Sequence, residues 1–380
     1  MHSTSSQVAD QRKDLVVSKI ETMLESMVDV LLEKEGELTI TLRTRPSARP
    51  TSVPSATNTT PTRDICFPGK TPEEAWRFTV LIRILGFVHD ALATNVIITK
   101  RDIYYRHPAL FVKQAVVDKY VDDLAFTFGV PRLSLNVSAA AKGLFAGAIS
   151  IKKANGFKVD GCSEREGLLV PKLDDTDTID IDAVRWILVV EKEATFRSLA
   201  TGRFWETLRH QGVMITAKGY PDLATRYLLR TISHPSARNN HHCPPVHVLV
   251  DFDPDGIDIL STYKHGSISL AHETAALKLP DVRWLGVKSS ETLFTQDSEE
   301  AQQGQPSRSV HHGYGLLSLS RRDRTKATRM LARHTLAEDG PETEWRRETQ
   351  VMLMLNVKAE IQILEQRTRG LAGWLEGRLR

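Results

Sequence analysis

The sequence predicts a multi-domain α/β protein, and two patterns support this prediction. Three segments with helical signals are followed by two short apolar segments, which is the outline of a winged helix-turn-helix domain. Further along, apolar runs typical of buried strands alternate with helical segments, which predicts a parallel α/β sheet with helices after it. A chain of 380 residues with 41% hydrophobic content is long and apolar enough for two or three domains.

The first 43 residues are predicted to form a helix and a strand that stand apart from these two domains. An apolar residue recurs at alternating spacings of four and three along the helix predicted over 15–35, at Val16, Ile20, Met23, Met27 and Val30. This seam packs either on the protein's own core or on a partner helix. Residues 38–42 alternate as a short strand. The stretch 44–62 is rich in Pro, Ser and Thr, so we predict a flexible linker over 44–70.

The segment 71–165 contains the helix-turn-helix outline. Thr71 is a helix cap for a helix that runs to about Leu92, and Thr99 with Asp102 forms a second capping box. A third helix is predicted from about Leu110 to Phe128, with Gly129 as its stop. The apolar segments 133–137 and 144–151, separated by a turn at Lys142-Gly143, are predicted to pair as the wing.

Positive charge is concentrated in the same segment. Residues 97–158 contain ten Lys or Arg and four Asp, a local charge of +6, whereas the whole chain has a net charge of only +3. Such a local excess is typical of a surface that binds nucleic-acid phosphates. The alternative is an ordinary solvated helical face. The coincidence with the helix-turn-helix outline favours DNA binding.

The segment 166–380 contains the predicted parallel sheet. The apolar run Trp186–Val190 leads into Glu191, and the run Val246–Val250 leads into Asp251 and Asp253. Because the carboxyl ends of parallel strands meet at one edge, these three carboxylates are expected to converge there. Oxygen ligands suit a hard cation such as Mg²⁺. The alternative is that the aspartates only form turns and helix caps.

Two further features are predicted near the C-terminus, and several protein classes are excluded. Residues 296–314 look like a mobile insertion, and 341–368 are predicted as a long final helix. The three scattered cysteines are typical of reduced thiols in an intracellular protein. We find no apolar run long enough to span a membrane, no secretory signal and no phosphate-binding loop of an ATPase.

Five motifs in order resemble the A subunit of DNA topoisomerase VI, and most of all its eukaryotic meiotic relatives that make double-strand breaks. They are TKRDIYYRHPALF (99–111), SAAAKGLFAG (138–147), VVEKEATF (189–196), AKGYPD (217–222) and LVDFDPDG (249–256). The resemblance extends over about 71–364. It implies a DNA-cleaving transesterase, with a winged-helix domain that carries a catalytic tyrosine and a Toprim domain that holds Mg²⁺.

The resemblance also implies roles for individual residues. Tyr105 matches the nucleophile and Arg101 matches the arginine that precedes it, while Glu191, Asp251 and Asp253 match the metal ligands. Lys100, Arg106, Lys142 and Tyr220 lie in the matching motifs and are expected to contact DNA. Independently of the family, a phenol is only about 0.1% ionised at pH 7. Arg101, one helical turn before Tyr105, could stabilise the phenolate or the transition-state charge.

The family further implies an assembly and a location. We expect a homodimer on double-stranded DNA, a B-type partner subunit, other meiotic break factors, action in the nucleus and no membrane association. The N-terminal helix is a candidate for docking the B-type partner.

Other functions are also compatible with parts of the pattern. An A subunit of a topoisomerase VI in somatic cells would share the same cleavage residues. Primases and nucleases also use Toprim acids, but hydrolysis with metal alone needs no tyrosine. A catalytically inactive DNA-binding homologue is disfavoured because all five proposed catalytic and metal-binding residues are present.

Overall fold

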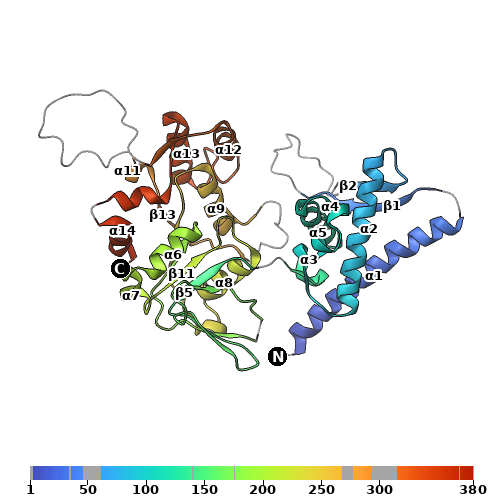
Figure 1. The fold of residues 1–380 in the computed structure, drawn as a ribbon, viewed down its shortest axis with the longest axis horizontal. Coiled ribbons are helices and arrows are strands. Elements are labelled where there is room, and N and C mark those ends of the chain that lie inside the picture. Colours follow the sequence, from blue (N-terminus) through green and yellow to red (C-terminus); the bar gives the residue numbers. More distant parts are fainter. Residues whose placement is uncertain are drawn as a thin grey trace, which may run out of the picture. The chain divides into compact units, whose positions relative to one another are not determined.

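The computed structural model of the chain describes residues 3–33, 36–45, 61–138, 141–174, 176–267, 277–292, 315–367 and 369–379. They fall into two compact units, the first built mainly of Met1–Ala140 and the second of Ala141–Gly266 with Leu277–Arg380 (Figure 1). The boundary near 140 differs from the predicted domain boundary at 165, because strands that follow Ala141 belong to the second unit.

The first unit is mostly helical. Its helices are α1 (Ser3–Glu33), α2 (Pro72–Ala93), α3 (Lys100–Arg106), α4 (Pro108–Phe111) and α5 (Gln114–Phe128). Its strands are β1 (Leu38–Arg43), β2 (Thr62–Phe67), β3 (Ile98–Thr99) and β4 (Val137–Ser138), with a 3-10 turn η1 (Arg132–Leu135). All three predicted helical segments are therefore present.

The apolar seam of α1 packs inside this unit. Val16 and Ile20 are fully buried, and Met27 is nearly so, in the same core as α2 and α5. The seam is therefore used internally, as the first of the two sequence interpretations expected. The large apolar side chains that α1 leaves exposed lie outside this seam, at Leu15, Val28, Leu31 and Leu32.

The prediction of a linker over 44–70 is wrong in its second half. β2 pairs with β1 in antiparallel register, with Leu38 opposite Phe67 and Arg43 opposite Thr62. Ile65 of β2 is buried in the core of the first unit. Positions 46–60 of the predicted linker lie outside the described residues. The N-terminal helix and strand thus belong to the same unit as the helices that follow.

The caps predicted from sequence are confirmed. The side chain of Thr71 accepts a hydrogen bond from the amide of Glu74, and Thr99 and Asp102 form a reciprocal capping box at α3. Gly129 ends α5 in the left-handed conformation, with φ of 70°. The predicted third helix is instead divided into α4 and α5 at Val112, whose φ of 62° is unusual for a β-branched residue.

The predicted wing is not formed by the two segments assigned to it. Residues 132–135 form η1, and β4 pairs in parallel with β3, with Ile98 opposite Val137. The following strand β5 (Leu144–Gly147) pairs with a strand of the second unit. Lys142 therefore precedes a sheet strand and does not lie at the tip of a wing.

The second unit is built on a six-stranded sheet in the order β13-β12-β10-β11-β5-β8. Its members are β5, β8 (Leu168–Leu169), β10 (Trp186–Val190), β11 (Gly212–Thr216), β12 (Val246–Leu249) and β13 (Arg283–Gly286). The four strands β13, β12, β10 and β11 are parallel, and β5 and β8 add antiparallel partners at one edge. The predicted parallel α/β sheet is thus confirmed, with β13 as a strand that sequence patterning missed.

Helices connect the parallel strands. They are α6 (Glu193–Thr201) and α7 (Arg203–Leu208) after β10, α8 (Leu223–Ser233) after β11, and α9 (Pro254–His265) after β12 (Figure 1). The 3-10 turn η2 (Ala237–Asn239) precedes β12, and α11 (Ser289–Thr292) follows β13. The same unit contains a separate three-stranded sheet of β6 (Ser150–Lys152), β7 (Lys158–Asp160) and β9 (Thr178–Asp180). All five residues of β10 are buried, which explains their continuous apolar run.

The C-terminal part differs from the single long helix predicted over 341–368. It contains α13 (Thr343–Leu355), β15 (Val357–Ala359), the 3-10 turn η5 (Ile361–Gln366) and α14 (Gly370–Leu379). Asn356 ends α13 in the left-handed conformation, and β15 then pairs with β14 (Leu316–Ser318). The helix α12 (Arg321–Leu331) begins at Ser320 with a capping box. The predicted insertion 296–314 lies outside the described residues.

Candidate active site

Two acids meet where neighbouring parallel strands end. β10 and β12 are paired so that Val190 lies opposite Leu249, and Glu191 and Asp251 follow one and two residues later. The backbone N–H of Asp251 donates a hydrogen bond of 2.9 Å to Oε2 of Glu191. The strand register therefore brings these two predicted site residues together.

Asp253 lies at the start of the helix that follows. Its carboxylate accepts a 2.7 Å hydrogen bond from the N–H of Gly256 and caps α9. A Cβ at Gly256 would lie 2.3 Å from the carbonyl oxygen of Asp251, so only glycine fits this close approach. The cap interpretation of Asp253 is thus satisfied. One oxygen is used in it, and a carboxylate has further acceptor capacity.

Burial and mutual repulsion make these carboxylates costly to ionise. Burial, followed by the charges of Asp251 and Asp253, raises the pKa of Glu191 to about 8. Burial is also the main reason that the pKa values of Asp251 and Asp253 are raised. A group of buried and half-buried acids with raised pKa values is typical of a functional site.

A lysine that we did not predict also belongs to this group. Nζ of Lys192 lies 2.9 Å from Oδ2 of Asp251 and 3.1 Å from Oε2 of Glu360. The other oxygen of Asp251 accepts a 2.8 Å hydrogen bond from the buried N–H of Ile361. In the described part of the chain, no three His, Cys, Asp or Glu side chains are grouped closely enough to hold a metal ion. The acids share one edge of the sheet, but Asp251 is held by Lys192.

The predicted nucleophile lies in the first unit, on the short helix α3. The side chain of Tyr105 is 62% exposed, whereas Tyr104 is half-buried against the core of α2 and α5. The two rings contact each other, with centroids 5.5 Å apart. Arg101, one turn earlier, is exposed as well. Of the adjacent tyrosines, Tyr105 is therefore the more exposed.

The next residues of the motif form a small aromatic and basic cluster. The guanidinium of Arg106 lies 5.1 Å from the ring centre of Phe87, and that of Arg83 lies 4.5 Å from it. Arg83 also contacts Nε2 of His107 at 2.8 Å. Arg106 is exposed, which is compatible with its expected contact with DNA.

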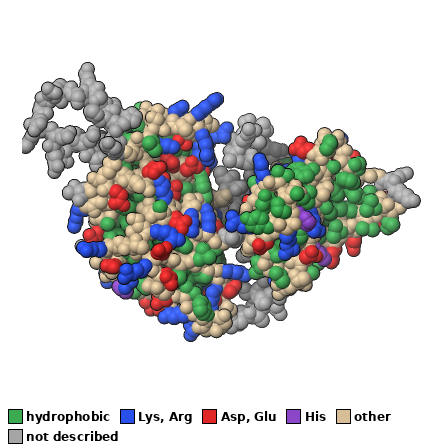
Figure 2. All heavy atoms as spheres, viewed as in Figure 1, with side chains coloured by type: hydrophobic (Ala, Val, Ile, Leu, Met, Phe, Trp, Pro, Cys, Tyr) green, Lys and Arg blue, Asp and Glu red, His purple; other side chains and the backbone are tan. Residues whose placement is uncertain are grey.

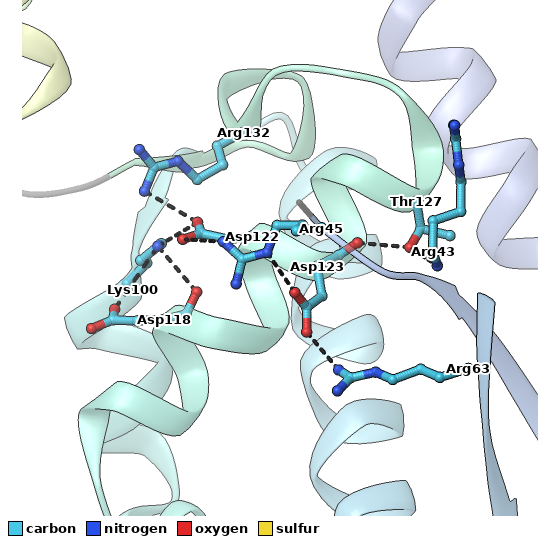
Figure 3. A network of polar contacts seen from close by, with 9 residues as sticks. All are labelled: Arg43, Arg45, Arg63, Lys100, Asp118, Asp122, Asp123, Thr127 and Arg132. Carbon is cyan, nitrogen blue, oxygen red and sulfur yellow. Dashed lines mark hydrogen bonds and ion pairs between the residues drawn. The ribbon is translucent and has the colours of Figure 1, made fainter. Parts of the chain in front are cut away.

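Lys100 is placed differently from what a DNA contact requires. It is 6% exposed, and its ammonium donates to the carboxylate of Asp122 at 2.6 Å (Figure 3). Arg132 shares the same Asp122 oxygen at 3.3 Å. Burial, followed by the charge of Arg132, lowers the pKa of Lys100. Its charge is therefore used within the unit, and we do not include it among the DNA contacts.

The surrounding network joins α5 to the N-terminal strands. Asp123, beside Asp122, binds Arg45 at 2.6 Å and Arg63 at 2.6 Å (Figure 3). The backbone N–H of Arg43 donates to the hydroxyl of Thr127 on the same helix. The α3 helix that carries Tyr105 is thus fixed through Lys100 to a helix that also holds β1 and β2.

The two other expected DNA contacts lie in the second unit. Lys142 is exposed, and its ammonium donates to the carbonyl oxygen of Lys218 at 3.2 Å. The hydroxyl of Tyr220 donates to Asp258 at 2.7 Å and accepts from Lys326 at 2.5 Å. The hydroxyl of Tyr220 is therefore engaged within its own unit, while 41% of the residue is exposed.

Comparisons with protein families match both units. The family model for the Toprim domain of the topoisomerase 6 A subunit and Spo11 matches residues 186–371, and the model for type IIB DNA topoisomerase matches residues 76–137. The first match includes the acids at the sheet edge, and the second includes α3 with its two tyrosines.

Individual proteins are similar over most of the chain. Meiotic recombination protein SPO11-1 of Oryza sativa subsp. indica is 38% identical over 290 residues, which cover 76% of this chain and 70% of the relative. Meiotic recombination protein SPO11 of Homo sapiens is 33% identical over 77% of this chain and 68% of its own length. DNA topoisomerase 6 subunit A3 of Oryza sativa subsp. indica is 34% identical over 76% of this chain and 60% of its own length.

Proposed function

Because this chain belongs to the family of topoisomerase VI A subunits and Spo11 proteins, we propose that it cuts duplex DNA by transesterification and initiates meiotic recombination. One combination of features carries this proposal. A single chain presents an exposed tyrosine on a capped helix and, in its Toprim domain, two hydrogen-bonded acids at the ends of neighbouring strands.

Tyr105 is the proposed nucleophile. Its phenolic oxygen forms a bond to the phosphorus of the DNA backbone while the bond from phosphorus to the 3′-oxygen breaks. The phenolic proton is lost and the departing 3′-oxygen takes up a proton, so the products are a 3′-hydroxyl and a 5′-phosphotyrosyl link. One ester replaces another, and the step needs no ATP.

Arg101 is the proposed stabiliser of this step. It lies four residues before Tyr105 on α3, and both side chains are exposed. Residues at this spacing are neighbours on a helix surface. A guanidinium can donate two parallel hydrogen bonds to phosphate oxygens, so Arg101 can bind the scissile phosphate next to the attacking oxygen.

Glu191, Asp251 and Asp253 are the proposed ligands of Mg²⁺. The donor chemistry fits, because all three are carboxylates and the burial and repulsion that raise their pKa values would be relieved by a divalent cation. The bound ion would supply Lewis-acid stabilisation to the phosphate and the departing 3′-oxygen.

We propose that two chains act together on one duplex. Each chain has one nucleophilic tyrosine, and a double-strand break needs two. Two-fold symmetry matches an antiparallel duplex and is the commonest arrangement of identical chains. In the proposed homodimer, Tyr105 of one protomer works with the acids of its partner.

Exposed basic residues in each unit are proposed to contact DNA. Arg101 and Arg106 contribute from α3, and Lys142 contributes from the second unit. Lys and Arg side chains also gather over α12 in the view of Figure 2, where Arg321, Arg322 and Arg329 are exposed. Their role would be to bind phosphates without reading sequence.

The proposed partners are a B-type subunit, with other meiotic break factors, and the nucleus is the proposed location. The C-terminal part of α1 exposes Val28, Leu31 and Leu32, which the internal seam does not use. An exposed apolar patch of this kind is typical of a helix that docks a partner. No helix in the described ranges combines the length and apolar content needed to cross a membrane.

The function is tested by isolating the protein from meiotic cells under denaturing conditions and assaying for covalently attached DNA. We expect DNA attached through its 5′ end, and only in cells that undergo meiosis. Attachment in mitotic cells as well would instead support the second candidate, the A subunit of a topoisomerase VI. Similarity to DNA topoisomerase 6 subunit A3 motivates that candidate. Its strand-passage activity would depend on ATP supplied through a B-type partner.

A further inference from the structure

The ammonium of Lys192 is paired with one of the proposed metal ligands in the Toprim domain, Asp251. It contacts Oδ2 of Asp251 at 2.9 Å, Oε2 of Glu360 at 3.1 Å and Oε1 of Gln362 at 3.2 Å. Burial alone would lower the pKa of Lys192, but the bonds to Asp251 and Glu360 raise it above its ordinary value. The ammonium of Lys192 is therefore charged, has three polar partners, and lies next to a proposed metal ligand.

Asp251 has both oxygens engaged in this arrangement. Oδ1 accepts the hydrogen bond from the N–H of Ile361, and Oδ2 is paired with Lys192. The Ile361 contact is a buried backbone bond that fixes the orientation of the carboxylate. The oxygen that no backbone N–H holds is thus the one paired with Lys192, and an ammonium and a divalent cation on the same oxygen would repel each other.

We propose that Lys192 is an internal cation that competes with the divalent metal for Asp251 and, when the metal binds, leaves Asp251 and keeps Glu360 and Gln362 as its partners. This inference rests on the proposed metal site. It adds that the affinity of that site is set by an exchange of cations, in which the chain itself supplies the competitor.

Glu360 and Gln362 are suited to receive the displaced ammonium. Both already contact Lys192, and the side chain of Glu360 is 56% exposed, so it can follow the ammonium without breaking core packing. A lysine has a flexible four-carbon stem with a point charge at its end, so the ammonium can shift by a few ångströms while Cα stays in place. The two residues lie at and beside η5, next to the Ile361 that orients Asp251.

The test measures metal affinity and does not depend on DNA cleavage. Mn²⁺ binding to the full chain is followed by the electron paramagnetic resonance signal of free Mn²⁺, with Mg²⁺ as competitor. We expect Lys192→Met to bind Mn²⁺ roughly tenfold more tightly, because the competing charge is gone. Lys192→Arg keeps the charge and should stay near the wild type. Melting curves of all variants show whether they are folded.

Lys218→Met is the matched control. Its ammonium is 3.0 Å from Glu193, and its side chain is 29% exposed, compared with 25% for Lys192. It removes the same charge from the same region without touching Asp251, so its effect on affinity should be much smaller. Equal tightening in both lysine variants would overturn the exchange, because a general change in charge would then explain it.

Glu360→Gln tests the second position of the ammonium. We expect Glu360→Gln to bind Mn²⁺ more weakly than the wild type. The same change made in Lys192→Met should weaken binding less, because Glu360 then has no ammonium to hold. Suppose that the wild type binds Mn²⁺, that Asp253→Ala removes this binding, and that Lys192→Met leaves the affinity unchanged. This result would refute the competition and support the metal site. Failure of the wild type to bind Mn²⁺ at these acids would refute the proposed metal site itself.

Discussion

The backbone N–H of Asp251 donates a hydrogen bond to the carboxylate of Glu191, and this contact joins the ends of two adjacent parallel strands. The donor is on the segment that leads to Asp253, and the acceptor directly follows β10. The relative position of two proposed metal ligands is therefore fixed by backbone pairing in the sheet.

The first prediction concerns the choice between adjacent tyrosines. Tyr105→Phe should abolish covalent protein–DNA adducts and leave DNA affinity unchanged, since it removes one oxygen and no positive charge. Tyr104→Phe is the matched control and should keep cleavage, because Tyr104 is half-buried against the core. Adducts are measured by gel shift of labelled DNA after denaturation. Activity in Tyr105→Phe together with its loss in Tyr104→Phe would reverse the assignment.

The second prediction concerns the acids. Glu191→Ala, Asp251→Ala and Asp253→Ala should each reduce Mg²⁺-dependent cleavage by roughly 100-fold or more, since losing an outer-shell partner alone typically costs 10–100-fold. Glu193→Ala is the control, because its carboxylate pairs with Arg197 and Lys218 instead. Cleavage rates at several Mg²⁺ concentrations provide the measurement. If all three variants kept the Mg²⁺ dependence of the wild type, the acids would be only turn and cap formers.

The third prediction concerns shared sites. A mixture of Tyr105→Phe and Glu191→Ala proteins should nick one strand, although each variant alone is inactive. The mixed dimer has one intact site made from the wild-type tyrosine of one chain and the wild-type acids of the other. Nicking is read on supercoiled plasmid, with differently tagged chains to show that mixed dimers form on DNA. Mixed dimers that leave the plasmid intact would show that each chain uses its own tyrosine and acids.

The fourth prediction separates folding from DNA binding in the basic segment. Lys100→Met should lower the free energy of unfolding by about 1–3 kcal/mol, because it removes a buried charge-assisted hydrogen bond to Asp122. Arg106→Gln should change stability by less than about 0.5 kcal/mol. It should instead reduce the slope of DNA affinity against salt by about one. Denaturant unfolding and salt titrations measure both, and a reversed pattern would return Lys100 to the DNA surface.

The fifth prediction concerns acid pH. Burial, followed by the charge of Arg283 opposite it on β13, lowers the pKa of His247. The unfolded chain therefore binds a proton at His247 more readily than the folded chain does. Stability from this group is present above the ordinary histidine pKa of about 6.5 and is lost as pH falls through the lower folded value. His247→Gln should lose less stability than the wild type between pH 7 and 5, as measured by denaturant unfolding. An identical pH profile in both proteins would contradict this role.

Local patterns predicted the parts of the fold whose causes are local. The caps at Thr71, Thr99 and Ser320 depend on residues three positions apart, and all three are formed. The acids after β10 and β12 could be placed because a buried parallel strand has a continuous apolar run and its carboxyl end faces the ligand.

Pairing over long distances could not be read from the same patterns. The segment 144–147 has the composition of a strand in either unit, and only the position of β11 decides which sheet it joins. Apolar residues recur on both sides of Asn356 in 341–368, so their spacing does not predict the left-handed turn at Asn356 that ends α13. The sequence predicts a DNA contact for Lys100 and no role for Lys192. Their partners Asp122 and Glu360 are 22 and 168 positions away, so no local pattern shows these ion pairs.

The two arginines that hold Asp123 also tie the end of β1 and the start of β2 to α5 through a single carboxylate. Arg45 precedes segment 46–60 and Arg63 follows it, and both bind the same carboxylate next to the paired strands β1 and β2. The anchors thus lie on either side of the segment and do not depend on its length.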